Sequence, residues 1–212
     1  MPDRSIIGKS INAENEIEMI DKFDDLKSKI KYVQLNCKHR DFFGSDYHNY
    51  KFNECLSDEE ITQFEEEHNV SLPNDYRRFI NEIGNGGLGP GYGLLELGYQ
   101  NSILKLLNYS KYIATPFPHS KAWNYDYENI DFDTETTDKE YQYLLAGSIP
   151  IAIMGCGYDE YLVITGKESG NIWTDARVGD YGIAPIRDAN NNPLDFFTWY
   201  DLWLDGVIKK YK

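Results

Sequence analysis

Cys156 lies between two glycines, a setting in which a thiol could act as a nucleophile. Such chemistry would need His119 as the general base and an aspartate to orient the imidazole. No local motif marks this combination. A small residue at the tight end of a hairpin explains Gly-Cys-Gly without any reaction, so we predict no catalytic residue here.

Two pairs of carboxylates are the other candidates for acid/base chemistry. Asp159 is adjacent to Glu160, and Asp175 precedes Asp180 by five residues. Either pair could transfer protons if burial separated the two pKa values. Positions in turns and at strand ends explain them more simply, and we therefore expect a protein that is not an enzyme.

The segment Asp131-Phe132-Asp133-Thr134-Glu135 is similar to the start of a calcium-binding loop. Thr136 stands where the EF-hand needs a glycine, and Gln142 stands where it needs a bidentate glutamate. An EF-hand is therefore excluded. An irregular divalent-ion site and a solvated acidic loop are the alternatives, and we predict no metal ligand from this segment.

The histidines and cysteines do not follow the spacing of a metal site. His39 and His48 are nine residues apart, and the three cysteines (Cys37, Cys55, Cys156) contain no CxxC pair. An odd number of widely spaced cysteines also argues against a disulfide framework. We expect reduced thiols.

A glycine-rich stretch follows at residues 84–93. Gly84, Gly86 and Gly89 match GxGxxG in form. A dinucleotide loop must connect a strand to a helix, whereas here a helix precedes and a strand follows, with Pro90 interrupting. We predict no bound cofactor and a turn whose backbone has positive φ and approaches the sheet closely.

Composition limits the class of protein. The length of 212 residues suggests one domain with an appendage. The hydrophobic fraction of 41% is enough to form a core. The net charge is -14, which disfavours direct binding to nucleic acid. No stretch of about 20 apolar residues is present, and Asp3, Arg4 and Lys9 stand where a signal peptide would be apolar. We expect a cytoplasmic protein that does not bind membranes.

The negative charge is concentrated in two places. Residues 57–100 contain nine acidic and two basic residues, and Ala122–Glu140 contains seven acidic residues and only Lys139. These two stretches supply nearly all of the excess negative charge.

The elements that position these residues are predicted by hydrophobic periodicity. Between Glu14 and Leu35 apolar residues recur every three or four positions, as in an amphipathic helix. That stripe consists of Ile17, Ile20, Phe23, Leu26, Ile30 and Val33. An aromatic-rich connector, Cys37–Glu54, follows.

Ser57 and Glu60 form the pattern of a capping box and predict the start of a helix. Asn74 is a candidate N-cap for a second helix that ends at Gly84. Its inner face comprises Tyr76, Phe79, Ile80 and Ile83.

The C-terminal half has the pattern of a meander. Ile149–Met154, Tyr161–Ile164 and Asn171–Thr174 read as strands joined by tight turns. Leu194–Ile208 predicts an apolar helix that packs on the sheet. The order helices, strands, helix favours an α+β fold with an antiparallel or mixed central sheet and packed helices.

Several motifs resemble the SUKH superfamily, which includes the yeast cell-wall assembly (glucan synthesis) regulator and many bacterial immunity proteins. They run in the expected order from Phe64-Glu65 and Leu72-Pro73-x-x-Tyr76 to Ile172-Trp173 and Trp203-Leu204. The residues that we assign to structural motifs are Ser57, Glu60, Leu72, Pro73, Tyr76, Gly86, Gly87, Gly89, Tyr92, Gly93 and Trp173. The resemblance suggests an N-terminal helical extension and connector at 1–51. A SUKH-like domain at 52–212 would contain a variable acidic segment at about 122–146.

The resemblance implies a non-enzymatic immunity protein that binds and neutralises a cognate secreted polymorphic toxin, such as a nuclease. A regulatory protein-interaction module is the alternative. The acidic segment is our hypothesised contact, because its carboxylates suit a basic toxin surface and its tyrosines suit an interface. The proposed contact residues are Tyr125, Asp126, Tyr127, Glu128, Asp131, Asp133, Glu135 and Asp138. Both a monomer and a homodimer are compatible with the sequence.

Overall fold

A computed structural model describes residues 22–37, 42–124 and 143–211. The hypothesised contact residues of the acidic segment and the calcium-loop-like sequence lie outside these ranges. So do Ile17 and Ile20 of the predicted N-terminal stripe.

The sheet is an antiparallel meander with the strand order β1-β2-β3-β4. Its strands are β1 (Ser148–Gly155), β2 (Tyr158–Val163), β3 (Ile172–Asp175) and β4 (Ile183–Pro185). The three predicted strands and the α+β class are confirmed. β4 was not predicted; its three residues include one fully buried side chain, that of Ile183.

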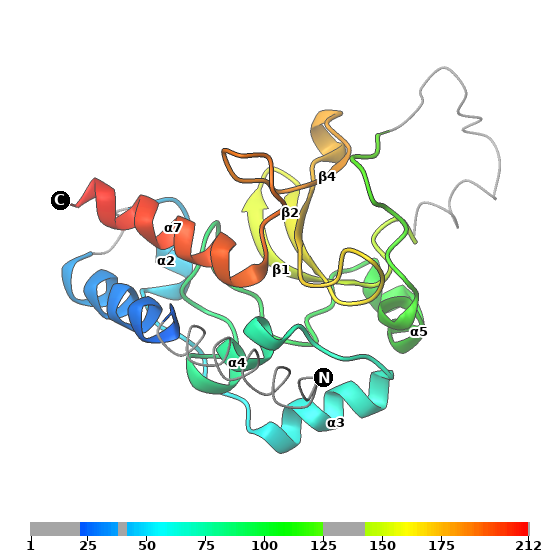
Figure 1. Ribbon diagram of the computed structural model, residues 1–212, viewed down its shortest axis with the longest axis horizontal. Coiled ribbons are helices and arrows are strands. Elements are labelled where there is room, and N and C mark those ends of the chain that lie inside the picture. Colours follow the sequence, from blue (N-terminus) through cyan, green and yellow to red (C-terminus); the bar gives the residue numbers. More distant parts are fainter. Residues whose placement is uncertain (1–21, 38–41, 125–142, 212) are drawn as a thin grey trace, which may run out of the picture.

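Helices cover both faces of the sheet (Figure 1). Apart from the N-terminal helix, which is described over residues 22–36, the longest elements are α3 (Asp58–His68), α4 (Asn74–Glu82) and α7 (Phe196–Lys210). The short ones, which the sequence analysis did not predict, are α2 (Ser45–His48), η1 (Leu104–Leu106), α5 (Tyr109–Ala114) and η2 (Arg177–Gly179). In Figure 1, α7 lies on one side of the strands and α5 on the other.

The capping box at the start of α3 is confirmed. The Glu60 backbone N–H donates to the Ser57 hydroxyl (3.2 Å), and the Ser57 N–H donates to the Glu60 carboxylate (2.8 Å). These two bonds satisfy N–H groups that have no partner within the helix. They fix the start of α3, the helix that carries the acidic side chains.

Replacing Ser57 by alanine is expected to lower the free energy of unfolding by about 1 kcal/mol, because the Glu60 N–H loses its acceptor. Urea denaturation measures the difference. Ser57→Asp serves as the matched control, because its carboxylate can accept the same hydrogen bond and should retain most of the stability. Equal losses in both variants would contradict the assignment.

The prediction that Asn74 caps α4 is wrong. Pro73 occupies the N-cap position and Asn74 is the first helical residue. The Asp75 carboxylate accepts from the backbone N–H groups of Tyr76 (2.8 Å) and Phe197 (3.0 Å). One side chain therefore satisfies donors in the first turns of α4 and α7. Burial raises the pKa of Asp75, while these hydrogen bonds oppose that rise.

The N-terminal helix packs against the same chain. In its described part, residues 22–36, the predicted stripe is buried at Phe23, Leu26, Ile30 and Val33. The Phe23 ring contacts Phe197 of α7, with ring centroids 5.2 Å apart. This helix completes the core on the outer side of α7 and α4.

Lys29 fixes the orientation of the N-terminal helix on α7. Its ammonium lies 2.7 Å from the Asp201 carboxylate and 2.9 Å from that of Asp205. These partners raise the pKa of Lys29 against the opposing effect of burial.

The glycine-rich loop joins the helical half to the sheet. Gly87 pairs with both Phe52 and Leu94, and Leu94 pairs with Ala152 of β1. Gly87 has φ +107°, and a Cβ atom there would lie 2.4 Å from the Lys51 carbonyl oxygen. The predicted turn with positive φ and close backbone approach is therefore confirmed.

Candidate functional site

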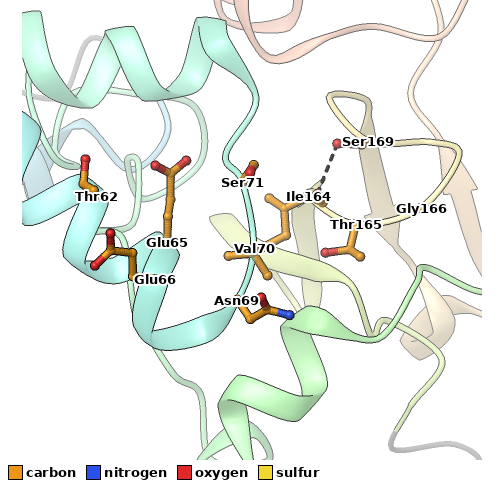
Figure 2. A pocket seen from close by; sticks show the side chains of 10 residues that line it. All are labelled: Thr62, Glu65, Glu66, Asn69, Val70, Ser71, Ile164, Thr165, Gly166 and Ser169. Carbon is orange, nitrogen blue, oxygen red and sulfur yellow. Dashed lines mark hydrogen bonds between the residues drawn. The ribbon is translucent and has the colours of Figure 1, made fainter.

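A polar groove of about 640 Å³ separates α3 from the turn after β2 (Figure 2). One wall is formed by Thr62, Glu65, Glu66, Asn69, Val70 and Ser71, and the other by Ile164, Thr165, Gly166 and Ser169. The second wall is fixed by hydrogen bonds from the Thr165 hydroxyl to the Ile113 carbonyl (2.7 Å) and from the Ser169 hydroxyl to the Ile164 carbonyl (3.1 Å). The groove therefore has two anchored walls.

The two glutamates of the groove differ in their partners. Glu65 accepts from the backbone N–H of Leu72 (2.7 Å), and its other oxygen lies 3.6 Å from the Arg77 guanidinium. Glu66 is exposed, and within the described ranges no hydrogen bond or ion pair engages its carboxylate. Glu65 is thus structural, whereas the Glu66 carboxylate is available to a partner.

The outer face of α3 extends the same acidic surface. A second hollow of about 330 Å³ is lined by Asp58, Glu59, Thr62, Gln63 and Glu66. Thr62 and Glu66 line both hollows. We call the α3 acidic surface the five residues that line this second hollow together with Glu65.

One cation lowers the negative charge of this surface. The Arg77 guanidinium lies 2.7 Å from the Asp58 carboxylate, and this hydrogen bond raises the pKa of Arg77. The Arg77 guanidinium contacts the carboxylates of Asp58 and Glu65. The carboxylates of Glu59 and Glu66 are exposed to solvent.

The carboxylate pairs named from the sequence are arranged differently in the fold. Glu160 faces α7, where it accepts a hydrogen bond from the Trp199 indole N–H (3.1 Å). Asp159, its neighbour, is on the other face because side chains alternate along a strand. It pairs in the ladder with Asp175, whose carboxylate forms a bidentate contact with Arg177 (2.6 and 2.8 Å).

Burial, and secondarily the nearby Asp175, raises the pKa of Asp159. The structure thus brings Asp159 and Asp175 together, which adjacency in sequence did not suggest. Arg177 neutralises one member of this pair.

Cys156 and His119 are not brought together. Cys156 is exposed at the β1–β2 turn with φ +52°. The His119 ring packs on Trp173, which pairs with Tyr161, five residues along the chain from Cys156. The His119 Nε2 is instead hydrogen-bonded to the Leu144 carbonyl oxygen (2.8 Å), and within the described ranges no hydrogen bond joins the imidazole to the Cys156 thiol.

The flanks of the acidic segment are anchored to the sheet. Trp123 exchanges two backbone hydrogen bonds with Ile183 of β4 (2.7 and 2.8 Å). On the other flank, the Leu144 carbonyl accepts from His119 Nε2 (2.8 Å), and burial lowers the pKa of His119. The described residues on either side of the segment therefore meet at one edge of the fold.

The motif residues have structural positions. Leu72, Tyr76 and Trp173 are buried, and Tyr92 packs between Phe43 and Tyr47 with ring centroids 5.1 and 4.6 Å away. The glycines at 86, 87 and 93 have positive φ. Gly89 has no positive φ, and its reason is steric: a Cβ atom there would lie 2.7 Å from the Leu94 side chain.

Two further properties concern the described residues alone. Within them, no three His, Cys, Asp or Glu side chains gather in a way that suits a metal ion. None of the helices in the same ranges has both the length and the apolar character needed to cross a bilayer.

Comparison with known proteins identifies the family. The sequence model of the SMI1/KNR4 family (SUKH-1) matches residues 55–191. The chain belongs to the SMI1/KNR4 family. Neither a curated protein nor a solved structure matches it.

The SMI1/KNR4 match covers α3, α4, the glycine-rich loop and all four strands. Both walls of the α3 groove therefore belong to the family domain. The described N-terminal helix and α7 lie outside the matched residues, although both contribute buried side chains to the core.

The negative charge of α3 is visible in the sequence, whereas the second wall of the groove is not. Thr165, Gly166 and Ser169 carry no chemical signal by themselves, and they are distant in sequence from α3. Only the path of β2 over the fold brings this turn opposite Glu66.

Proposed function

We propose that this chain is a non-enzymatic immunity protein that binds a cognate toxin through the α3 acidic surface. The observation that carries the proposal is the position of that surface within the SMI1/KNR4 domain, together with the exposed Glu59 and Glu66 carboxylates. We infer a toxin with a basic surface, such as a nuclease or another enzyme that acts on nucleic acid.

Electrostatics supports this choice of partner. A protein with net charge -14 attracts a basic partner over a distance set by ionic strength, about 10 Å in 0.1 M salt. A site that binds phosphate presents lysines and arginines, and carboxylates placed against them would compete with the nucleic acid. The same charge disfavours direct binding of this chain to nucleic acid.

The acidic segment stays a proposed second contact, because its residues lie outside the described ranges. Support comes from its sequence and from its anchored flanks, Trp123 and Leu144. We propose likewise that residues 1–51 are an extension to a SUKH-like domain at 52–212, and that the protein acts in the cytoplasm.

The charge on Glu66 provides the direct test. Glu66→Lys is expected to slow association with the toxin about tenfold at low salt, and the difference should shrink in about 0.5 M salt. Stopped-flow or surface plasmon resonance at several salt concentrations measures the association rate, with the toxin encoded beside this protein as ligand.

Glu67→Lys is the matched control, because Glu67 carries the same charge on the same helix but does not line either hollow. Its association rate should fall much less. Equal rates for wild type and Glu66→Lys would contradict binding at the α3 acidic surface. Failure of the wild-type protein to rescue growth from the adjacent toxin, or to co-purify with it, would refute the immunity function and favour the regulatory module.

A further inference from the structure

The α3 groove has room for several residues of a partner. Its volume of about 640 Å³ lies within the range of pockets that hold whole small-molecule ligands. Its lining extends from Thr62 to Asn69, a distance of about 10 Å along a helix. An extended chain covers that distance with about three residues. The groove therefore matches a short segment of polypeptide in length.

Some main-chain groups at the groove have no partner within the described part of the protein. Residues 69–73 connect α3 to α4 without helical structure. In the described ranges no hydrogen bond engages the Ser71 N–H or the Val70 carbonyl, and the same is true of the Gly166 N–H on the opposite wall. An extended peptide carries a donor and an acceptor on almost every residue, so it can bind to such groups as a strand binds to a sheet edge.

The floor of the groove is apolar. Val70 is partly buried against the core, Ile164 is 4% exposed, and Figure 2 shows both side chains between the two walls. Such a floor suits the aliphatic stem of a long basic side chain, whose charged end stays in a polar setting. A bare metal ion gains nothing from it, since the favourable contacts of hard cations are with oxygen atoms.

Negative charge borders this floor. Glu65 and Glu66 are the charged residues of the lining, which contains no lysine or arginine. Glu65 already binds the Leu72 N–H (2.7 Å) and lies 3.6 Å from the Arg77 guanidinium, so the carboxylate that is available to a partner is that of Glu66. Asn69, the C-cap of α3, also lines the groove, and the helix dipole adds partial negative charge at that end. The lining therefore favours one positive group.

We propose that the α3 groove binds an extended segment of the toxin and that one arginine of this segment enters it. The inference rests on the proposed function, because it narrows the α3 acidic surface to the point where charge and shape coincide. The arginine stem lies on Val70 and Ile164, and its guanidinium binds the Glu66 carboxylate. Arginine fits better than lysine, because its planar group has five N–H donors and further acceptors line the groove at Thr62 and Asn69.

A segment bound in the groove changes the dissociation rate more than the association rate. Long-range charge governs the approach of the toxin, whereas the short-range contacts of a filled groove are broken only when the complex separates. A variant that fills the groove without altering its charge therefore tests this inference separately from the electrostatic role of Glu66.

Ser169→Trp fills the groove from the turn after β2. Ser169 is exposed, and its hydroxyl donates one hydrogen bond to the Ile164 carbonyl (3.1 Å), so the variant loses one contact of the turn and leaves the core intact. Surface plasmon resonance with the toxin encoded beside this protein is expected to show dissociation at least about tenfold faster. The association rate should change by less than about twofold, because the charge is the same.

Ser71→Trp fills the same groove from the α3–α4 connection, so the test does not depend on one turn accepting a large side chain. Ser71 is exposed, and its dissociation rate should rise to a similar extent. Urea denaturation checks that both variants keep the stability of the wild type. Ser102→Trp is the matched control, because Ser102 is exposed and does not line the groove. An equal effect of Ser102→Trp would contradict the role of the groove.

Replacing the arginines of the toxin one at a time by alanine identifies the bound side chain. One of these toxin variants should lose about tenfold in affinity for the wild-type protein. The same variant should lose much less affinity for Glu66→Gln, because the contact is already broken there. Such coupling of one arginine to Glu66 indicates a direct contact, since long-range attraction is shared among many charges.

Wild-type dissociation rates in both Ser169→Trp and Ser71→Trp would overturn the groove as the binding site, even where Glu66→Lys slows association. The absence of coupling between Glu66 and any toxin arginine, or coupling to a lysine instead, would overturn the assignment to arginine. A wild-type protein that does not bind this toxin at all would refute the proposed function and the groove together.

Discussion

Replacing Gly87 by alanine is expected to lower the free energy of unfolding by about 3 kcal/mol. Two effects combine at this residue. Its φ of +107° is unfavourable for any residue with a side chain, and the new Cβ would lie 2.4 Å from the Lys51 carbonyl oxygen. The neighbouring atoms are backbone, so a rotamer change cannot relieve the clash.

The loss should extend beyond the loop itself. Gly87 exchanges hydrogen bonds with Leu94 (2.7 and 2.9 Å), and the neighbouring Leu88 carbonyl accepts from the Tyr200 hydroxyl (2.8 Å). Displacing this backbone therefore disturbs the contact between the loop and α7. Urea denaturation followed by far-ultraviolet circular dichroism measures the change.

Gly170→Ala is the matched control for Gly87→Ala. Gly170 also has positive φ (+95°), but a Cβ there would have no atom within 4 Å. The control isolates the cost of the backbone conformation, which is about 1 kcal/mol. Equal losses for the two variants would show that the close approach at Lys51 contributes nothing to stability.

Local patterns in the sequence predicted the elements that rely on local physics. The capping box at Ser57 needs only residues within one turn, and the strand hairpins need only alternating residues and a tight turn. The amphipathic stripe of the N-terminal helix likewise predicted which side chains are buried in its described part. These features depend on neighbours in the sequence, so composition and spacing suffice.

The elements that were missed depend on contacts between distant residues. β4 has three residues, and it pairs on one side with β3 and on the other with Trp123. No periodicity can be read from so short a segment. The prediction of the α4 cap failed for a related reason. The side chain that accepts hydrogen bonds at this helix start is Asp75, and one of its donors, the Phe197 N–H, is far along the chain.

The candidate site was predictable in its charge but not in its shape. The acidic run of α3 is visible in the sequence, whereas the wall formed by Thr165 and Ser169 follows from the packing of the β2–β3 turn. An apolar hollow of about 350 Å³ beside the C-terminal half of α7 is a similar case. Phe43, Met154 and Trp203 meet there from three separate segments, so their exposure could not be read from their residue types.

The second large expected effect concerns a carboxylate in the core. Glu160 is 9% exposed and faces Trp199 across the interface between the sheet and α7. Burial raises the pKa of Glu160 to about 7, and the hydrogen bond from the Trp199 indole N–H only partly opposes this rise. The unfolded chain releases this proton near pH 4.5, whereas the folded protein holds it until about pH 7.

The sign of the pH dependence follows from this difference. Below about pH 4.5 Glu160 is protonated in both states and leaves stability unchanged. Between about pH 4.5 and 7 the unfolded chain loses the proton first, so stability falls as the pH rises. Above about pH 7 the folded protein bears the full cost of a buried charge, about 3 kcal/mol.

Glu160→Gln should therefore stabilise the protein by about 3 kcal/mol at pH 8 and by less than about 1 kcal/mol at pH 5. The glutamine oxygen can still accept from the Trp199 indole N–H, so the contact between β2 and α7 is retained. Denaturation at several pH values measures both differences. Glu67→Gln, on the exposed part of α3, should change stability equally at the two pH values. A Glu160→Gln effect that does not grow with pH would show that the buried carboxylate is not the source of the dependence.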